Sequence, residues 1–203
     1  MTRGGDVDET KRATLRRFAA LGAASPLVSI AGATESDSDT PEAIAGYIAA
    51  TPGAHFSKIR DDLKLGTGET QHHLRQLERD GAVESRKDGD YRRYFPAGRF
   101  SAFEQVALGY LRRETPRGLL VALLEDPETS AGEIADRLGV SRPSVSKYAT
   151  QLDEAGLLSR EDGYAVENAE TILLLLVRYA DSFGEDAARL ADAAPDLVDY
   201  DPS

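Results

Sequence analysis

The 203-residue sequence contains no cysteine and only three histidines. The missing thiols exclude disulfide bonds, zinc sites built from thiolates and cysteine nucleophiles, although they leave the redox compartment undetermined. Two of the histidines, His72 and His73, are adjacent, so on a helix they point about 100° apart and do not converge on one metal ion. We therefore expect neither a metal site nor a bound cofactor.

Long hydrophobic runs and the short motifs of enzymes are also missing. A densely apolar stretch, Thr171 to Val177, has only seven residues, whereas a helix needs about 20 to span a bilayer. This stretch predicts core or a dimer interface, and we expect no stable membrane span. The sequence has no phosphate-binding glycine loop, no paired catalytic carboxylate motif and no nucleophile elbow. We therefore expect a protein that is not an enzyme.

Positive charge is scarce, and its distribution is uneven. The net charge of −11 opposes non-specific binding to nucleic acid, because affinity for phosphate depends on Lys and Arg. Residues 40–100 nevertheless carry a net charge of +1, whereas 1–39, 101–170 and 171–203 carry −1, −6 and −5. Five Lys stand against nineteen Arg. This acidic, lysine-poor composition resembles that of proteins from salt-loving archaea, in which negative charge is a solubility feature.

An internal repeat organises the chain. At a constant offset of 75 residues, the segment Pro52 to Gly81 aligns without a gap with the segment Pro127 to Gly156. Most identical positions are expected in cores or turns, which is what two copies of one fold would show. The identical pairs are Pro52/Pro127, Ile59/Ile134, Asp61/Asp136, Leu63/Leu138, Gln76/Gln151, Leu77/Leu152 and Gly81/Gly156.

The first copy is predicted to contain three helices. Thr40 is the expected N-cap of the first helix and Ser57 that of the second. A tight glycine-containing turn over residues 65–68 then leads into the third helix, which ends near Gly81. Apolar spacing gives this third helix a buried stripe. The stripe consists of Thr70, His73, Leu74 and Leu77.

A hairpin follows the helices in each copy. In the first copy, residues 82–85 and 91–95 are predicted strands, joined by a turn at 87–90 with the Asp-Gly signature. Three helices and a hairpin are the order of a winged helix. In the second copy Thr115-Pro116 caps the first helix, and the hairpin at 157–166 is shorter, with one basic residue where the first hairpin has four.

The predicted fold class is therefore mainly α with small β wings: two tandem winged helix-turn-helix modules plus connecting and C-terminal helices. Module 1 covers residues 40–98 and module 2 covers 114–168. A connecting helix is expected within 99–113, with a C-terminal helical segment and acidic tail at 169–203. Residues 1–39 are expected to form an N-terminal tail or helix and a linker.

The N-terminal segment has a second interpretation. A basic stretch followed by a mild apolar run over residues 18–33 resembles a secretory signal, and Arg16-Arg17 resemble the twin-arginine type. Phe18 follows the pair directly, without the usual intervening residue. We expect a short helix or tail and a cytoplasmic protein, with export as the alternative.

Two segments carry a family resemblance. HFSKIRDDLKLGTGETQHHLRQLERDGAVESRKDGDYRRYFP and SAGEIADRLGVSRPSVSKYATQLDEAGLLSREDGYAV resemble the MarR-like and ArsR-like winged helix families of transcriptional regulators. With the first helices, the resemblance covers roughly 130 of the 203 residues. It implies a third helix that reads the major groove of DNA, a wing that touches phosphate or the minor groove, and a dimer on two half-sites.

The third helix and wing of module 1 hold the residue types that this role requires, because Arg pairs with guanine and Gln with adenine. Singly, each is also an ordinary solvated helix residue. The predicted DNA contacts of module 1 are Thr67, Gly68, Gln71, His72, Arg75, Gln76, Arg79, Arg86, Lys87, Arg92 and Arg93. Those of module 2, weaker because its surroundings are acidic and Glu154 lies on the same face, are Arg142, Ser144, Ser146 and Lys147.

The sequence thus predicts a homodimeric transcriptional regulator that binds double-stranded DNA in a sequence-specific manner, with module 1 as the main reader. The alternative is a winged-helix scaffold that binds proteins and does not contact DNA. The net charge of −11 favours the scaffold, whereas the positive charge of residues 40–100 favours the DNA reader.

Overall fold

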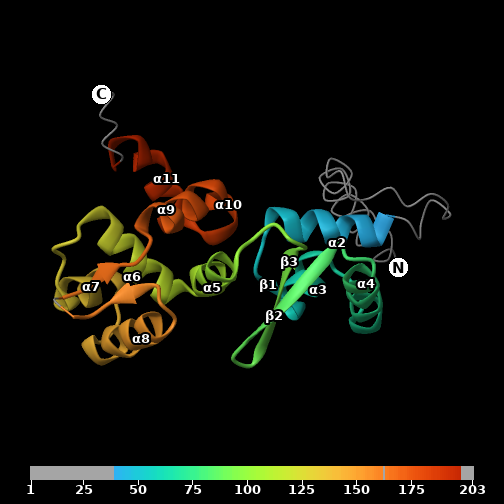
Figure 1. Cartoon of the computed structure of the whole chain (residues 1–203), viewed down its shortest axis with the longest axis horizontal. Coiled ribbons are helices and arrows are strands. Elements are labelled where there is room, and N and C mark those ends of the chain that lie inside the picture. The colour runs from blue at the N-terminus through green and yellow to red at the C-terminus, as the bar shows by residue number, and fades with distance from the viewer. Residues whose placement is uncertain (1–38, 162, 198–203) are drawn as a thin grey trace, which may run out of the picture. The chain divides into compact units, whose positions relative to one another are not determined.

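The computed structural model describes residues 39–161 and 163–197, in two compact units that divide between Ser101 and Ala102 (Figure 1). The signal-like segment lies outside the described residues. In the first unit the elements are α2 (Asp39–Ala50), β1 (Ala54–His55), α3 (Phe56–Asp62), α4 (Thr67–Arg79), β2 (Val83–Asp88) and β3 (Tyr91–Pro96). Its three strands form one antiparallel sheet in the order β1-β3-β2.

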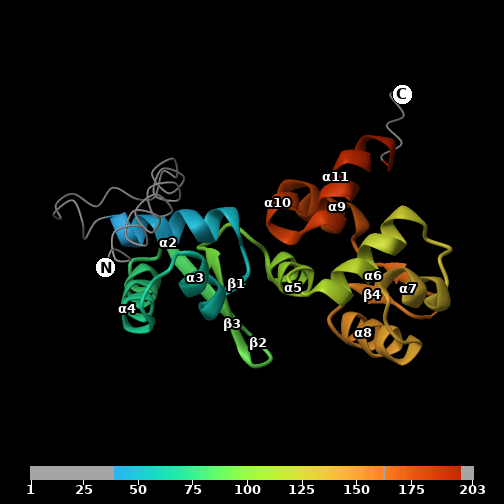
Figure 2. The ribbon, with the colours of Figure 1, turned by 180° about the vertical axis from the view of Figure 1, so that it is seen from behind.

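The core of the first unit lies between α2, α3, α4 and the base of the sheet. Ile44 and Ile48 of α2 meet Ile59 of α3 and Leu74 of α4, all of them fully or almost fully buried. The buried stripe predicted for the third helix is present, except that His73 is half-buried. Both views show the β2–β3 hairpin extending beyond the helices as a wing (Figures 1 and 2).

The turn before α4 differs from the expectation of a glycine turn. The left-handed backbone conformation falls on Lys64, with φ of 56°. Gly66 is the N-cap in an extended conformation, and Gly68 lies inside the helix. Gly81, by contrast, adopts the expected left-handed conformation after α4, with φ of 71°.

In the second unit the same plan recurs. Its elements are α5 (Ala102–Leu111), α6 (Glu114–Glu125), α7 (Ala131–Leu138), α8 (Arg142–Glu154), β4 (Leu158–Ser159), β5 (Ala165–Val166), α9 (Ala169–Arg178), α10 (Ala180–Phe183) and α11 (Glu185–Leu197). The bounds of α6 and α8 are those of α2 and α4 shifted by 75 residues. The two-stranded β4–β5 wing is shorter, as expected.

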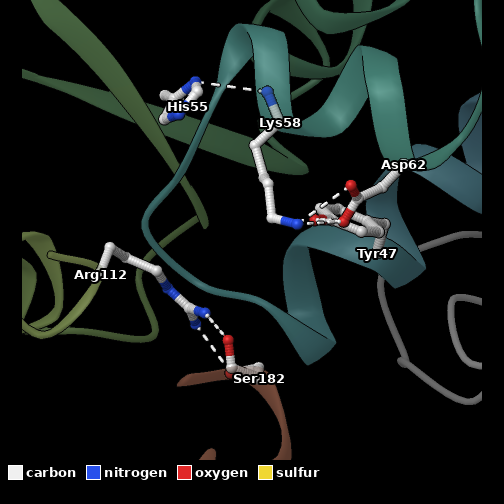
Figure 3. Close-up of polar contacts among 6 residues, drawn as sticks. All are labelled: Tyr47, His55, Lys58, Asp62, Arg112 and Ser182. Carbon is white, nitrogen blue, oxygen red and sulfur yellow. Dashed lines mark hydrogen bonds and ion pairs between the residues drawn. The ribbon is translucent and has the colours of Figure 1, made fainter. Parts of the chain in front are cut away.

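The helix that was expected to connect the modules belongs to the second unit, where α5 packs on α6 and α9. Two arginines join these helices to the C-terminal segment. Arg112 donates to the Ser182 carbonyl oxygen (2.6 Å) and hydroxyl (2.9 Å) (Figure 3), and its guanidinium lies 4.2 Å from the centre of the Phe183 ring. Arg117 pairs with Asp186 at 2.8 Å. The segment after the second wing is therefore a packed part of this unit.

Three predicted caps are wrong by one or two residues. Thr40 lies inside α2, which begins at Asp39. His55 and not Ser57 caps α3, and Arg113 and not Thr115 precedes α6. Sequence patterns locate helix ends less well than helix interiors, because several polar residues near an end can serve as the cap. Among the described residues, no helix is both long and apolar enough to cross a membrane.

Candidate nucleic-acid interface

Helix α4 is held so that one face packs inward and the other is open. Its first turn is closed by the Glu69 carboxylate, which accepts from the Gly66 backbone N–H at 3.1 Å, and by the Thr70 hydroxyl, which donates to the Gly66 carbonyl at 2.9 Å. Leu74 and Leu77 anchor the helix in the core. The opposite face is consequently presented to solvent.

The structure brings the predicted α4 residues together on that open face. Six of them are exposed, and Gln76 is half-buried at the edge. At Gly68 a Cβ atom would meet nothing within 4 Å, so the first turn is open to close approach. Another macromolecule can therefore reach these side chains without rearrangement. The exposed residues are Thr67, Gly68, Gln71, His72, Arg75 and Arg79.

Glu78, an acidic residue of α4 near this face, interacts with residues of the wing. The Glu78 carboxylate accepts from the Ser85 hydroxyl and lies 3.9 Å from the Arg92 guanidinium. Arg75 and Arg79 are linked to each other, because the Arg79 side chain donates to the Arg75 carbonyl at 3.3 Å. The two arginines therefore dominate the electrostatics of the exposed face.

The wing carries three exposed cations. In the β2–β3 ladder Arg86 pairs with Arg93, and Lys87 with Arg92. Cross-strand partners lie on the same side of a hairpin and successive residues on opposite sides, so Lys87 and Arg92 share one side. Arg86, Lys87 and Arg92 are all exposed, which the predicted contact with DNA would require.

Arg93 corrects the prediction of a four-residue basic wing surface. Only 3% of Arg93 is exposed. Its guanidinium pairs with Asp88 and donates to the Gly53 carbonyl at 2.9 Å. Arg93 therefore holds the wing to the loop before β1 and is not available to a phosphate. Its charge gave no hint of this, and Tyr94 and Phe95 beside it in β3 are buried as well, so simple alternation along the strand would not have revealed it.

Tyr91 is the surface residue that the sequence reasoning missed. An aromatic residue in a strand usually belongs to the core, but half of Tyr91 is exposed. Its ring centre lies 4.8 Å from that of His55 and 5.8 Å from the Arg93 guanidinium. Tyr91 therefore adds an aromatic surface to the wing beside Arg92.

His55 joins this cluster to the start of α3. Its Nδ1 accepts from the Lys58 backbone N–H at 3.3 Å (Figure 3). Burial lowers the pKa of His55 below its ordinary value of 6.5, and the charges of Arg93 and Lys58 lower it further. The neutral imidazole that serves as the cap is thus the favoured form. At the other end of α3, Asp62 accepts from the Tyr47 hydroxyl at 2.7 Å and pairs with Lys58 at 2.8 Å (Figure 3).

The corresponding surface of module 2 has fewer cations. Arg142, Ser146 and Lys147 are exposed on α8, and Ser144 is half-buried within hydrogen-bonding distance of Ser141. The Arg142 guanidinium lies over Gly132, where a Cβ atom would come within 2.9 Å of it. The predicted residues are therefore near one another, but Arg142 packs along α7.

Acidic groups surround these cations. Asp153 and Glu154 are exposed at the end of α8, and Glu161 is exposed on the wing. The wing arginine, Arg160, donates to the Thr150 hydroxyl at 2.7 Å. Among the described residues, no group of three or more His, Asp or Glu side chains is placed to hold a metal ion. Module 2 thus repeats the shape of module 1 without its positive surface.

Comparison with known proteins agrees with this architecture. Residues 38–108 match a family model for an N-terminal helix-turn-helix domain, and residues 117–164 match the MarR family. The chain is similar to an uncharacterised HTH-type transcriptional regulator of Methanocaldococcus jannaschii, with 29% identity over 126 residues. That match covers 62% of this chain but only 32% of the relative. No solved structure matches the chain.

The first match covers module 1 and runs into α5, and the second covers most of module 2. The predicted resemblance and the predicted fold class are therefore both confirmed. The chain therefore contains two winged helix-turn-helix units in tandem, the first similar to an N-terminal HTH domain and the second similar to the MarR family.

Proposed function

We propose that this protein regulates transcription by binding double-stranded DNA, and that module 1 is its main DNA reader. The observation that carries the proposal is the exposed face of α4, where Arg75 and Arg79 project beside a wing with three exposed cations. In helix-turn-helix proteins the second helix of the motif enters the major groove, and α4 holds that place in module 1. The match to HTH-type families supports the same role.

The contacts divide by chemistry. Arg75 and Arg79 can each form a bidentate pair with guanine, and Gln71 can pair with adenine. Lys87 and Arg92 extend from the wing, where their charges suit phosphate. Tyr91 offers an aromatic face beside them. In this proposal the helix sets sequence preference and the wing adds affinity that depends on salt.

Module 2 contributes to regulation by assembly more than by reading DNA. Asp153, Glu154 and Glu161 would face phosphate if α8 entered a groove as α4 does. Each would weaken binding by repulsion. We also propose that the protein acts in the cytoplasm, where it meets DNA, and that it needs no cofactor.

The proposal is tested by selecting bound duplexes from a random DNA library with the full chain, at low and at high potassium chloride. We expect enrichment of one sequence motif, lost when Arg75 and Arg79 are both replaced by Ala. If the chain binds no DNA at any salt concentration, this result would support the scaffold function, which the acidic surface of module 2 favours.

A further inference from the structure

Helix α9 leaves large apolar side chains in solvent. Leu174 is 62% exposed and Val177 is 38% exposed, whereas Ile172, Leu175 and Leu176 face the core of the second unit. Leu174 and Val177 are three residues apart, so they lie on the same side of the helix. Leu174 and Val177 are therefore less buried in the second unit than Ile172, Leu175 and Leu176.

Two opposite charges flank the apolar side chains. Glu170 precedes Leu174 by four residues and Arg178 follows it by four, and both are exposed. Eight residues of helix separate them by about 12 Å, which is too far for a salt bridge within one chain. Along the helix the exposed face is therefore acidic at Glu170, apolar at Leu174 in the centre and basic at Arg178. We call the face formed by Glu170, Thr171, Leu174, Val177 and Arg178 the α9 stripe.

We propose that the α9 stripe binds the α9 stripe of a second copy of this chain, antiparallel about a two-fold axis beside Leu174. That arrangement places the two Leu174 side chains in contact and puts Val177 opposite Thr171 of the second copy. Each Glu170 then lies level with an Arg178 across the interface. A two-fold interface must be complementary to itself, and the order of charges on the α9 stripe meets this condition.

Within the second unit, the helix that carries the stripe is separate from α8. Both views place α9–α11 at the opposite end of the second unit from α8 (Figures 1 and 2). The ten residues of α9 make a contact about 15 Å long and about 10 Å wide, which is much less than the roughly 800 Å² per partner of a stable complex. The dimer is therefore weak in solution. When two copies bind neighbouring sites on DNA, their high local concentration makes the weak contact form. This step rests on the proposed function.

Cysteine cross-linking tests the register, because the chain has no cysteine of its own. Leu174→Cys should form a disulfide-linked dimer under mild oxidation without DNA. Thr171→Cys and Val177→Cys should cross-link efficiently only when the two variants are mixed. Arg189→Cys, which is exposed on α11 outside the stripe, is the control and should stay monomeric. Equal cross-linking of all four variants, or none by Leu174→Cys, would overturn the proposal.

Charge reversal tests the pairing. Glu170→Arg and Arg178→Glu should each weaken dimerisation about tenfold in sedimentation equilibrium, because each brings like charges together. The double variant should restore it. Two single variants that fail to weaken the dimer, or a double variant that stays weak, would contradict the antiparallel register. Far-UV circular dichroism checks that every variant is folded.

DNA binding separates this proposal from the proposed function. On a duplex with one binding site, the single charge variants should bind as the wild type does. On a duplex with two half-sites one helical turn apart, they should lose cooperativity. If neither the wild type nor any variant binds either duplex, the proposed DNA-binding function is wrong. Successful cross-linking in that case would still support the dimer.

Discussion

Modules 1 and 2 share one backbone plan and differ in the surface placed on it. Helices α2 and α4 recur as α6 and α8 at the same offset of 75 residues, with the same lengths. Buried apolar residues occupy equivalent places, such as Ile59 and Ile134. The face of α4 carries Arg75 and Arg79, whereas α8 ends in Asp153 and Glu154. The comparison shows that core and turn positions specify this fold, while exposed positions are free to diverge.

The two wings also share one plan and differ in length and in the positions of their cations. In module 1 the two wing strands have six residues each and are tied to the loop before β1 through Arg93, whereas the wing strands of module 2 have two residues each. A longer, anchored hairpin can hold cations away from the helical body. The short wing holds Arg160 against Thr150. Each of the following predictions changes one side of this comparison.

Replacing Arg93 by Ala should have the largest effect, a loss of about 3 kcal/mol in the free energy of unfolding of module 1. The substitution leaves the Asp88 carboxylate without its buried partner. Chemical denaturation followed by circular dichroism measures it. Arg92→Ala is the matched control, because Arg92 is exposed and its removal should change stability by less than about 0.5 kcal/mol. Equal effects of the two substitutions would contradict the anchoring role of Arg93.

Replacing Arg75 and Arg79 together by Ala should weaken specific DNA binding about 100-fold, since each bidentate contact is worth about 1–3 kcal/mol. The equivalent double change in module 2, Arg142→Ala with Lys147→Ala, should weaken it less than about threefold. Fluorescence anisotropy with a selected duplex measures both. A larger effect in module 2 would reverse the roles that we assign.

Replacing Lys87 and Arg92 by Ala should weaken binding to specific and random DNA alike. Each lost phosphate contact should reduce the slope of log affinity against log salt by about 0.9. Affinity measured over a range of potassium chloride concentrations gives the slope. In module 2, Arg160→Ala should leave the slope of log affinity against log salt unchanged, because the Arg160 side chain is hydrogen-bonded to Thr150.

The smallest effect should be a difference in acid sensitivity. His55 and Ser130, at the same offset of 75, cap α3 and α7. Because the pKa of folded His55 is lowered from 6.5, protonation favours the unfolded state, so the stability of module 1 should fall as pH drops below about 6.5. Hydrogen bonds from Ser130 lower the pKa of Glu133 from 4.5, so their contribution is present above that value and is lost as pH falls through the lowered pKa.

Denaturation between pH 7 and 5 measures this difference. His55→Asn keeps a capping side chain and removes the titration, so it should abolish the change in module 1. Persistence of the pH dependence in this variant would assign it to another group.

The prediction of helices from the sequence was accurate where many residues shared one pattern. The spacing of Leu74 and Leu77 identified the buried side of α4, and therefore also its exposed side. Predictions that depended on one residue were less accurate. Ser57 and Thr115 are ordinary capping residues, but the backbone places His55 and Arg113 at those positions. A local choice among neighbouring polar residues is decided by how the chain packs on either side.

The sequence by itself determined the tandem winged-helix architecture, because the 75-residue repeat and the apolar periodicity encode the same core twice. It also located most of the cations on α4 and the wing. Only the tertiary structure decided which cations are accessible. Arg92 and Arg93 are neighbours of identical chemistry, yet the pleat of β3 points one to solvent and the other to Asp88. Exposure depends on contacts between distant segments, and composition does not report those contacts.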